Sequence, residues 1–249
     1  MTVIDAKNLH FSELGAQLRT HAGASVQIKN CLGHRYIAAG VENLQVEIEG
    51  VPGNALGAYL GTGSKITVRG NAQDATGDTM SGGTIIIHGF TGDAAGYGMR
   101  GGVILVKGNA GYRAGIHMKE FGETCPSLVI GGCAGDFLGE YQAGGNIVVL
   151  GLEAQTGAQN DAAPQLVGRF CGTGQHGGRI FLRTEQLPRE LPPQVSHRPA
   201  TPEDIEAIRP VLAQYAAAFD ADLALLLSSS YLLMTPNSAN PYKSMYAQY

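Results

Sequence analysis

The sequence predicts an all-β protein: a right-handed parallel β-helix with a short N-terminal helical cap and a C-terminal helix and tail. The first observation behind this prediction is that a glycine closes a run of apolar residues at intervals of 19 to 24 residues. These glycines are Gly50, Gly70, Gly89, Gly108, Gly132 and Gly151. The second is the pattern Gly-x-x-Gly-x-x-x-Gly, which recurs between them, as at Gly89, Gly92 and Gly96, and is interrupted once by Gln73. Repeats of this length are typical of solenoids, in which each turn packs only on its neighbours.

The third observation is a short strand in every repeat, and these strands can be stacked directly as KITVR, TIIIH, VILVK, SLVIG, NIVVL and RIFLR. Their second and fourth positions are apolar throughout. Because side chains alternate between the two faces of a strand, we expect both columns to point into the coil. The columns are Ile66, Ile85, Ile104, Leu128, Ile147 and Ile180, and Val68, Ile87, Val106, Ile130, Val149 and Leu182.

The glycine content is better explained by corners of a coil than by a ligand-binding loop. The chain has 36 Gly, well above the average usage of about 7%. A collagen-like or disordered chain is a poor fit, because 44% of the residues are apolar and the period Gly-X-Y is absent. A phosphate-binding loop requires a helix after the glycines, whereas here another strand follows each time. We therefore expect glycines where the coil changes direction or two backbones approach closely.

Three regions are expected along the chain: an N-terminal cap with the first strands (1–49), the β-helix (50–184), and a linker, helix and docking tail (185–249). Residues 8–21 predict a short helix, and SVQIKNC and QVEIEG predict strands. The prolines between residues 185 and 202 predict a linker without regular structure. Thr201-Pro202-Glu203-Asp204 is a typical helix start, so a helix is expected to run from about 202 to 219. The apolar segment after it must lie on the coil or on a partner.

The third strand position should face outward, yet it is apolar in most repeats. It reads Thr67, Ile86, Leu105, Val129, Val148 and Phe181. A continuous exposed strip of this kind marks an interface. Either the chain's own tail or a partner protein should cover it, and the sequence leaves both alternatives open.

Charge and composition exclude several classes of partner. The formal net charge is −4, and the 17 Lys and Arg are scattered, which disfavours nucleic acid and anionic membranes. The sequence shows no signal peptide and no apolar run of about 18 residues, so a cytoplasmic location is expected. The four cysteines (Cys31, Cys125, Cys133 and Cys171) are far apart and are expected to be reduced structural thiols.

No catalytic, cofactor-binding or metal-binding residue is predicted in this chain. The seven histidines (His10, His21, His34, His88, His117, His176 and His197) show no ligand spacing. Asp74, Asp93 and Asp136 recur at one position beside the corner glycines, where an aspartate is expected to accept hydrogen bonds from backbone amides. Residues 117–126 (HMKEFGETCP) break the repeat and predict a protruding loop that could serve for docking.

The segments GFTGDAAGYGMRGGVILVKGNAGYRAGIHMKEFGE and GGCAGDFLGEYQAGGNIVVLGL resemble the GXGXG domain at the C-terminal end of the glutamate synthase large subunit. The resemblance covers roughly residues 25–185. The flanking NCLGHRYIAAG and NPYKSMYAQY resemble the stand-alone form, in which the large subunit is split into separate proteins.

The resemblance implies a scaffold without catalytic residues of its own, within an oxidoreductase and amidotransferase complex. The partners would be a glutaminase-type amidotransferase subunit and an FMN and iron-sulfur synthase subunit, in a hetero-oligomer. The scaffold would brace them so that ammonia reaches 2-oxoglutarate. FMN and iron-sulfur clusters would then belong to the partners, with no cofactor in this chain.

Three other interpretations remain open at the level of sequence. N-methylglutamate synthase is built on the same plan with methylamine in place of ammonia. The C subunit of formylmethanofuran dehydrogenase, or of its formyltransferase/hydrolase relative, resembles the same coil. A homo-oligomeric structural protein could use the apolar third column for self-association.

Overall fold

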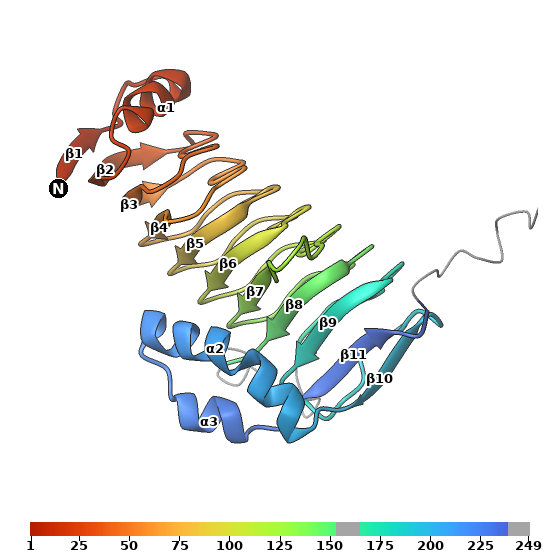
Figure 1. Cartoon of the computed structure of the whole chain (residues 1–249). Helices are drawn as coiled ribbons and strands as arrows, with labels where there is room; N and C mark the ends of the chain where they lie inside the picture. The colour runs from red at the N-terminus through yellow and green to blue at the C-terminus, as the bar shows by residue number, and fades with distance from the viewer. Residues whose placement is uncertain (153–164, 239–249) are drawn as a thin grey trace, which may run out of the picture.

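The computed structural model describes residues 1–152 and 165–238 and shows a parallel β-helix whose turns stack along one axis (Figure 1). Its strands form one 11-stranded sheet in the described part of the chain. They are β1 (Thr2–Asp5), β2 (Ser25–Leu32), β3 (Gln45–Val51), β4 (Lys65–Val68), β5 (Ser81–Ile87), β6 (Gly101–Val106), β7 (Ser127–Ile130), β8 (Ala143–Val149), β9 (Gly177–Leu182), β10 (Val195–Pro199) and β11 (Leu232–Pro236). The predicted fold class is confirmed.

The strands pair in parallel from β1 to β9, and the sheet then ends in two antiparallel strands in the order β9-β11-β10. Strand β10 lies within the proline-rich segment for which we predicted no regular structure, so that prediction was wrong. Pro199 is tolerated because β10 is the edge strand and Pro199 is its last residue, where a missing N–H breaks no interior ladder. The segment 153–176 before β9 is longer than a regular turn, and residues 153–164 of it lie outside the described residues.

Both predicted inward columns are buried in the coil, and every one of their side chains has 0% exposure. Each residue pairs with its counterpart in the next strand, as Ile85 does with Ile104 and Ile104 with Leu128. Burying one such side chain stabilises the fold by roughly 1.5–3 kcal/mol. The interior column Met80, Met99 and Met118 continues as Gln142 and Gln175, which are also fully buried and bond one another.

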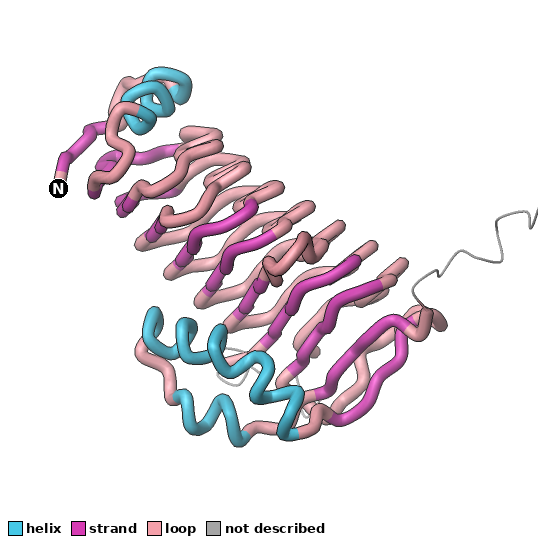
Figure 2. Tube along the Cα trace, viewed as in Figure 1, coloured by secondary structure: helices cyan, strands magenta, loops and turns pink. Residues whose placement is uncertain are grey.

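The N-terminal end of the coil carries α1 (Phe11–Arg19), within the region predicted to be helical (Figure 2). His10 and Glu13 form a reciprocal capping box at its start, and Leu14 and Leu18 are buried against the core. Strand β1 extends the sheet ahead of α1, although its four residues carried no clear signal in the sequence.

The recurring aspartates join successive turns. Asp74 Oδ1 accepts a hydrogen bond from Asp93 N at 2.9 Å, and Asp93 Oδ1 accepts one from Tyr112 N at 2.8 Å. Asp136 Oδ1 accepts from Arg169 N at 2.8 Å. The predicted role as an acceptor for backbone amides is confirmed, but each amide belongs to the following turn. At Gly111 a Cβ would lie 2.2 Å from Asp93 Oδ1, so glycine makes room for the carboxylate.

Asp93→Ala is expected to lower the free energy of unfolding by about 1–2 kcal/mol, because it leaves the Tyr112 amide without its acceptor. Asp93→Asn retains an amide oxygen at the same place and is expected to cost less than about 0.5 kcal/mol. Urea denaturation of both variants measures the difference. Equal losses would show that charge, and not the hydrogen bond between turns, is what Asp93 contributes.

Candidate partner-binding surfaces

The outward apolar strip is covered by the chain's own C-terminal helices, α2 (Pro202–Phe219) and α3 (Leu223–Ser228), as Figure 1 shows. This decides between the two alternatives that the sequence left open. From Ile86 onward the strip and the helices form a second hydrophobic core, separate from the interior of the coil. Its members include Ile86, Leu105, Val129, Val148 and Phe181 on the strands, and Ile208, Val211, Leu212, Tyr215 and Leu226 on the helices.

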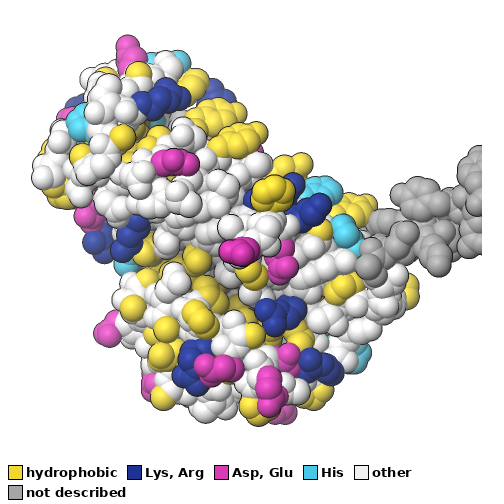
Figure 3. All heavy atoms as spheres, in the orientation of Figure 1, with side chains coloured by type: hydrophobic (Ala, Val, Ile, Leu, Met, Phe, Trp, Pro, Cys, Tyr) yellow, Lys and Arg dark blue, Asp and Glu magenta, His cyan; other side chains and the backbone are white. Residues whose placement is uncertain are grey.

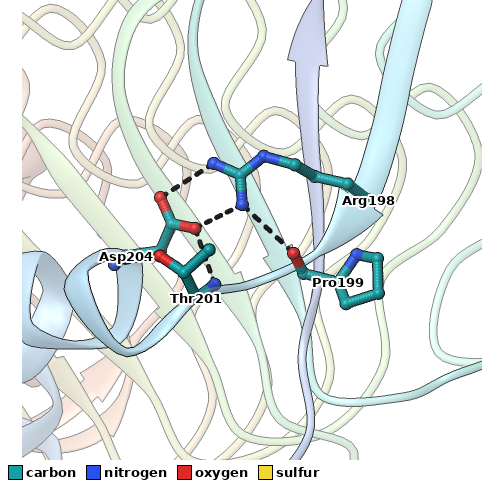
Figure 4. A network of polar contacts seen from close by, with 4 residues as sticks. All are labelled: Arg198, Pro199, Thr201 and Asp204. Atoms are coloured by element: carbon teal, nitrogen blue, oxygen red, sulfur yellow. Dashed lines mark hydrogen bonds and ion pairs between the residues drawn. The ribbon is translucent and has the colours of Figure 1, made fainter.

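A polar network fixes the start of α2 to strand β10 (Figure 4). The Asp204 carboxylate accepts a hydrogen bond from Thr201 N at 2.8 Å, and Thr201 Oγ1 accepts one from Asp204 N at 3.3 Å. Arg198 donates to both carboxylate oxygens of Asp204 and to the carbonyl oxygen of Pro199. The hydrogen bond from Arg198 holds the pKa of Asp204 at about 2.

This network predicts an acid-sensitive contribution to stability. The folded-state pKa of Asp204 is below the unfolded value of about 3.9, so the stabilisation is present above that pH and is lost as pH falls toward about 2. Asp204→Asn is expected to cost about 1 kcal/mol at pH 7, and its difference from the parent protein should disappear near pH 2. Glu206→Gln, which breaks an exposed pair with Arg209, is the control and should cost less than about 0.5 kcal/mol. A pH-independent difference in urea denaturation would contradict this prediction.

A groove of about 680 Å³ lies between the start of α2, the end of α3 and the start of β11. Glu206 and Arg209 on its wall pair with each other, and Glu185 adds a carboxylate. Tyr231, which also lines the groove, donates a hydrogen bond to the carbonyl oxygen of Leu226, and burial raises its pKa. The walls thus combine apolar groups, one ion pair and the single carboxylate of Glu185, which does not define a site for a particular ligand.

A second surface lies in the turns of the coil, away from the strands. Several aromatic side chains are exposed there, with Tyr59 at 62% and Tyr112 at 53%. Figure 3 shows hydrophobic side chains along this edge with Lys, Arg and His beside them. Aromatic residues and arginine are the types enriched at protein interfaces. The turns therefore have the composition of a partner-binding surface.

Two ring clusters organise the C-terminal half of this surface. His117 stacks on Tyr141 with ring centroids 5.2 Å apart and meets Tyr97 edge-on at 5.9 Å. Phe137 stacks on Phe170 at 5.2 Å, and the Arg113 guanidinium lies 4.7 Å from the Phe137 ring centroid. Stacked rings and a cation over a ring face restrict each other's rotamers, so the surface is largely preorganised.

The model of the GXGXG motif matches residues 18–236. The chain belongs to the GXGXG family. The resemblance drawn from the repeats is thereby confirmed.

Among relatives of this GXGXG chain, an uncharacterized protein of Methanocaldococcus jannaschii is 44% identical over 254 residues, covering 98% of this chain and 95% of that protein. A solved structure, from the formyltransferase/hydrolase complex of Methylorubrum extorquens in complex with methylofuran, contains a chain of similar shape. The TM-score is 0.58 with 21% identity, covering 94% of this chain and 96% of the other. This likeness shows the shared fold.

Three of the four thiols of the GXGXG chain are poor candidates for a nucleophile. Burial raises the pKa of Cys31 to about 11 and that of Cys171 to about 12, so both stay protonated at neutral pH. Burial, followed by the charge of Glu120, also raises the pKa of Cys125. The prediction that the chain carries no catalytic, cofactor-binding or metal-binding residue stays a prediction.

The structure brings two histidines near each other in a way that their sequence spacing did not indicate. Within residues 1–152 and 165–238 no group of three or more His, Cys, Asp or Glu could hold a metal ion. His117 and His176, however, line one shallow groove in the turns. Sequence spacing missed this pair, because the two lie in different repeats and only the alignment of columns brings them together.

The inserted loop of the GXGXG chain is exposed, as predicted. Phe121 is 72% exposed, and Phe121 and Thr124 exchange two backbone hydrogen bonds in a tight turn. A role for this loop in docking stays a prediction. Across the described residues no helix is long and apolar enough to cross a membrane.

Proposed function

We propose that the chain is a non-catalytic scaffold subunit of a glutamine-dependent, glutamate synthase-type complex in the cytoplasm. It braces a glutaminase-type amidotransferase subunit against an FMN and iron-sulfur synthase subunit. Ammonia released from glutamine then passes to 2-oxoglutarate within the assembly. FMN and the iron-sulfur clusters reside in the partner subunits, and this chain contributes shape and contacts.

The observation that carries this proposal is the exposed aromatic and basic surface of the turns. The chain's own helices already cover the apolar strip of the strands, so the face left for partners is the one bearing Tyr59, Tyr97, Tyr112 and Phe121. Consecutive turns of the coil are about 4.8 Å apart, so six strands of the ladder span roughly 25 Å. A rigid surface of that length can contact two proteins at once. Membership of the GXGXG family supports the glutamate synthase type, because that enzyme's large subunit ends in a domain of this kind.

A second candidate is the C subunit of a formyltransferase/hydrolase complex. It is supported by the similarity of shape, which extends over 94% of this chain and 96% of the chain from Methylorubrum extorquens. An N-methylglutamate synthase would use the same scaffold with methylamine as the amine. Each candidate assigns a different set of partner chains.

Affinity purification of the tagged chain from its native cell tests the proposal, with mass spectrometry and an absorbance spectrum of the eluate. A glutaminase-type chain and an FMN-type chain with yellow-brown colour would support it, and assays with ammonia and methylamine would then identify the amine. A molybdenum or tungsten partner, or a formyl carrier, would favour the second candidate. Colourless protein recovered alone, or as a symmetric oligomer, would overturn the glutamate synthase assignment.

A further inference from the structure

A shallow groove of about 350 Å³ runs along the turns of the coil. Backbone hydrogen bonds link the turns beneath it in succession, from Thr79 to Tyr97, from Gly98 to Ile116, from His117 to Glu140 and from Tyr141 to Thr173. At about 4.8 Å per turn the groove is close to 20 Å long, which matches about six residues of extended chain. Its lining includes Thr79, Tyr97, Arg100, His117, Lys119, Tyr141 and His176.

The groove is basic although the protein as a whole is acidic, with a formal net charge of −4. Arg100 and Lys119 line it together with His117 and His176, and no carboxylate is among its lining residues. Two carboxylates on the same turns lie outside the lining and are bound by neighbouring groups, although Thr79, which binds Asp78, itself lines the groove. Glu140 pairs with Arg113 at 3.0 Å, and Asp78 accepts a hydrogen bond from the Thr79 hydroxyl at 2.7 Å. The charge of the groove is therefore complementary to an acidic ligand.

Arg100 is held in place for such a ligand. Its Nη1 donates to the carbonyl oxygens of Gly98, at 2.7 Å, and His117, at 3.0 Å. No ion pair involves Arg100 within the described part of the chain. Because these two hydrogen bonds already hold the side chain, its remaining N–H groups can bind a carboxylate at little cost in side-chain conformational entropy.

The rings of the groove stand where the backbone alone favours glycine. His117 and Tyr141 have φ of 55° and 53°, in the left-handed region. Gly98 and Gly174 occupy the equivalent place in neighbouring turns, with φ of 58° and 69°. The same place holds Tyr59 and Thr79 in the preceding turns, with φ of 56° and 53°, so a left-handed residue here is a regular feature of the coil. This turn geometry places the stacked rings of His117 and Tyr141 in register along the groove.

We propose that this groove binds an extended acidic segment, about six residues long, from a partner protein. The identification of that partner as a subunit of the same complex rests on the function proposed above. Carboxylates of the segment pair with Arg100 and Lys119, and its intervening side chains pack against Tyr97 and the stacked pair His117 and Tyr141. The length of the groove favours a peptide over a compact small molecule.

Fluorescence anisotropy with fluorescein-labelled hexaglutamate and the isolated full chain tests the inference. We expect saturable binding at one site that weakens as NaCl rises from about 50 mM to about 500 mM. The double variant Arg100→Gln and Lys119→Gln should weaken binding about tenfold or more. The control variant Lys65→Gln and Lys107→Gln removes two exposed lysines outside the groove and should bind as the parent does. If the Arg100 variant does not fold, Lys119→Glu alone tests the same point, because Lys119 is exposed.

Other outcomes would overturn the proposal. These are absence of saturable hexaglutamate binding, or equal weakening in the control variant. Tighter, groove-dependent binding of tripolyphosphate would assign the groove to a small anion. Hexaglutamate binding that appears only after deletion of residues 239–249 would assign the groove to the chain's own tail. Dimerisation that is lost in the double variant would assign the groove to a second copy of the chain. The binding assay contains this chain and no partner subunit. Its result therefore does not depend on the outcome of the affinity purification that tests the proposed function.

Discussion

Tyr215→Ala is expected to lower the free energy of unfolding by about 3–4 kcal/mol. Tyr215 is 1% exposed and lies between α2 and the strands, within the second hydrophobic core. Its ring centroid is 4.8 Å from that of Phe219, and a Cβ on Gly131 would lie 2.0 Å from its hydroxyl oxygen. Alanine would leave a cavity between helix and sheet that rigid strands cannot collapse to fill.

Urea denaturation followed by circular dichroism measures this loss, with Tyr112→Ala as the control. Tyr112 is 53% exposed in a turn, so its replacement should change stability by less than about 0.5 kcal/mol. The Tyr215 variant should also bind a hydrophobic dye, because a loosened α2 uncovers Leu105, Val129 and Phe181. A small loss with no dye binding would mean that the helices cover the strip without stabilising it.

The strands were predictable because the burial of their side chains is local and repeats in every turn. Ile85, Ile104 and Leu128 are apolar at the same position, and the pairing of the strands follows from that column alone. The helix Pro202–Phe219 was predictable for another local reason, since Thr201 and Pro202 mark its first turn. Neither prediction needed knowledge of distant contacts.

The cover of the apolar strip and strand β10 depend on contacts between distant segments. Leu212 and Phe181 meet in one core although the linker separates them, and no periodicity in the tail indicates that contact. Strand β10 forms because β11 returns to pair with it, as Arg198 does with Leu233. Prolines near Pro199 suppressed the strand signal because sequence alone does not identify an edge strand.

The basic groove in the turns was missed for a related reason. Arg100, His117 and His176 come from separate repeats, and none of them lies in a motif that marks a binding site. Only the stacking of the turns places them together. The sequence did contain one usable signal. When the repeats are aligned as turns of a coil, His117 and Tyr141 fall at the same position of neighbouring turns, which places their rings side by side.

Gly102→Ala is expected to lower the free energy of unfolding by about 4 kcal/mol or more, which is a large part of the roughly 5–15 kcal/mol of an ordinary protein. Gly102 has φ of +80°, and a Cβ there would lie 2.7 Å from the carbonyl carbon and oxygen of Gly82 and from the oxygen of Gly83. These are backbone atoms of the preceding turn, and they lie between the ladder pairs Ser81–Gly101 and Thr84–Val103 of β5 and β6. The new methyl group can be admitted only by separating two turns of the coil.

Gly23→Ala is a matched control that isolates the backbone term from the steric one. Gly23 has the same φ of +80°, but a Cβ there would meet nothing within 4 Å. It should cost only the left-handed conformation of alanine, about 1–2 kcal/mol. The difference between the two variants in urea denaturation therefore measures the close approach of consecutive turns. Equal losses would show that the coil expands to admit a methyl group, and that glycine at its corners serves conformation alone.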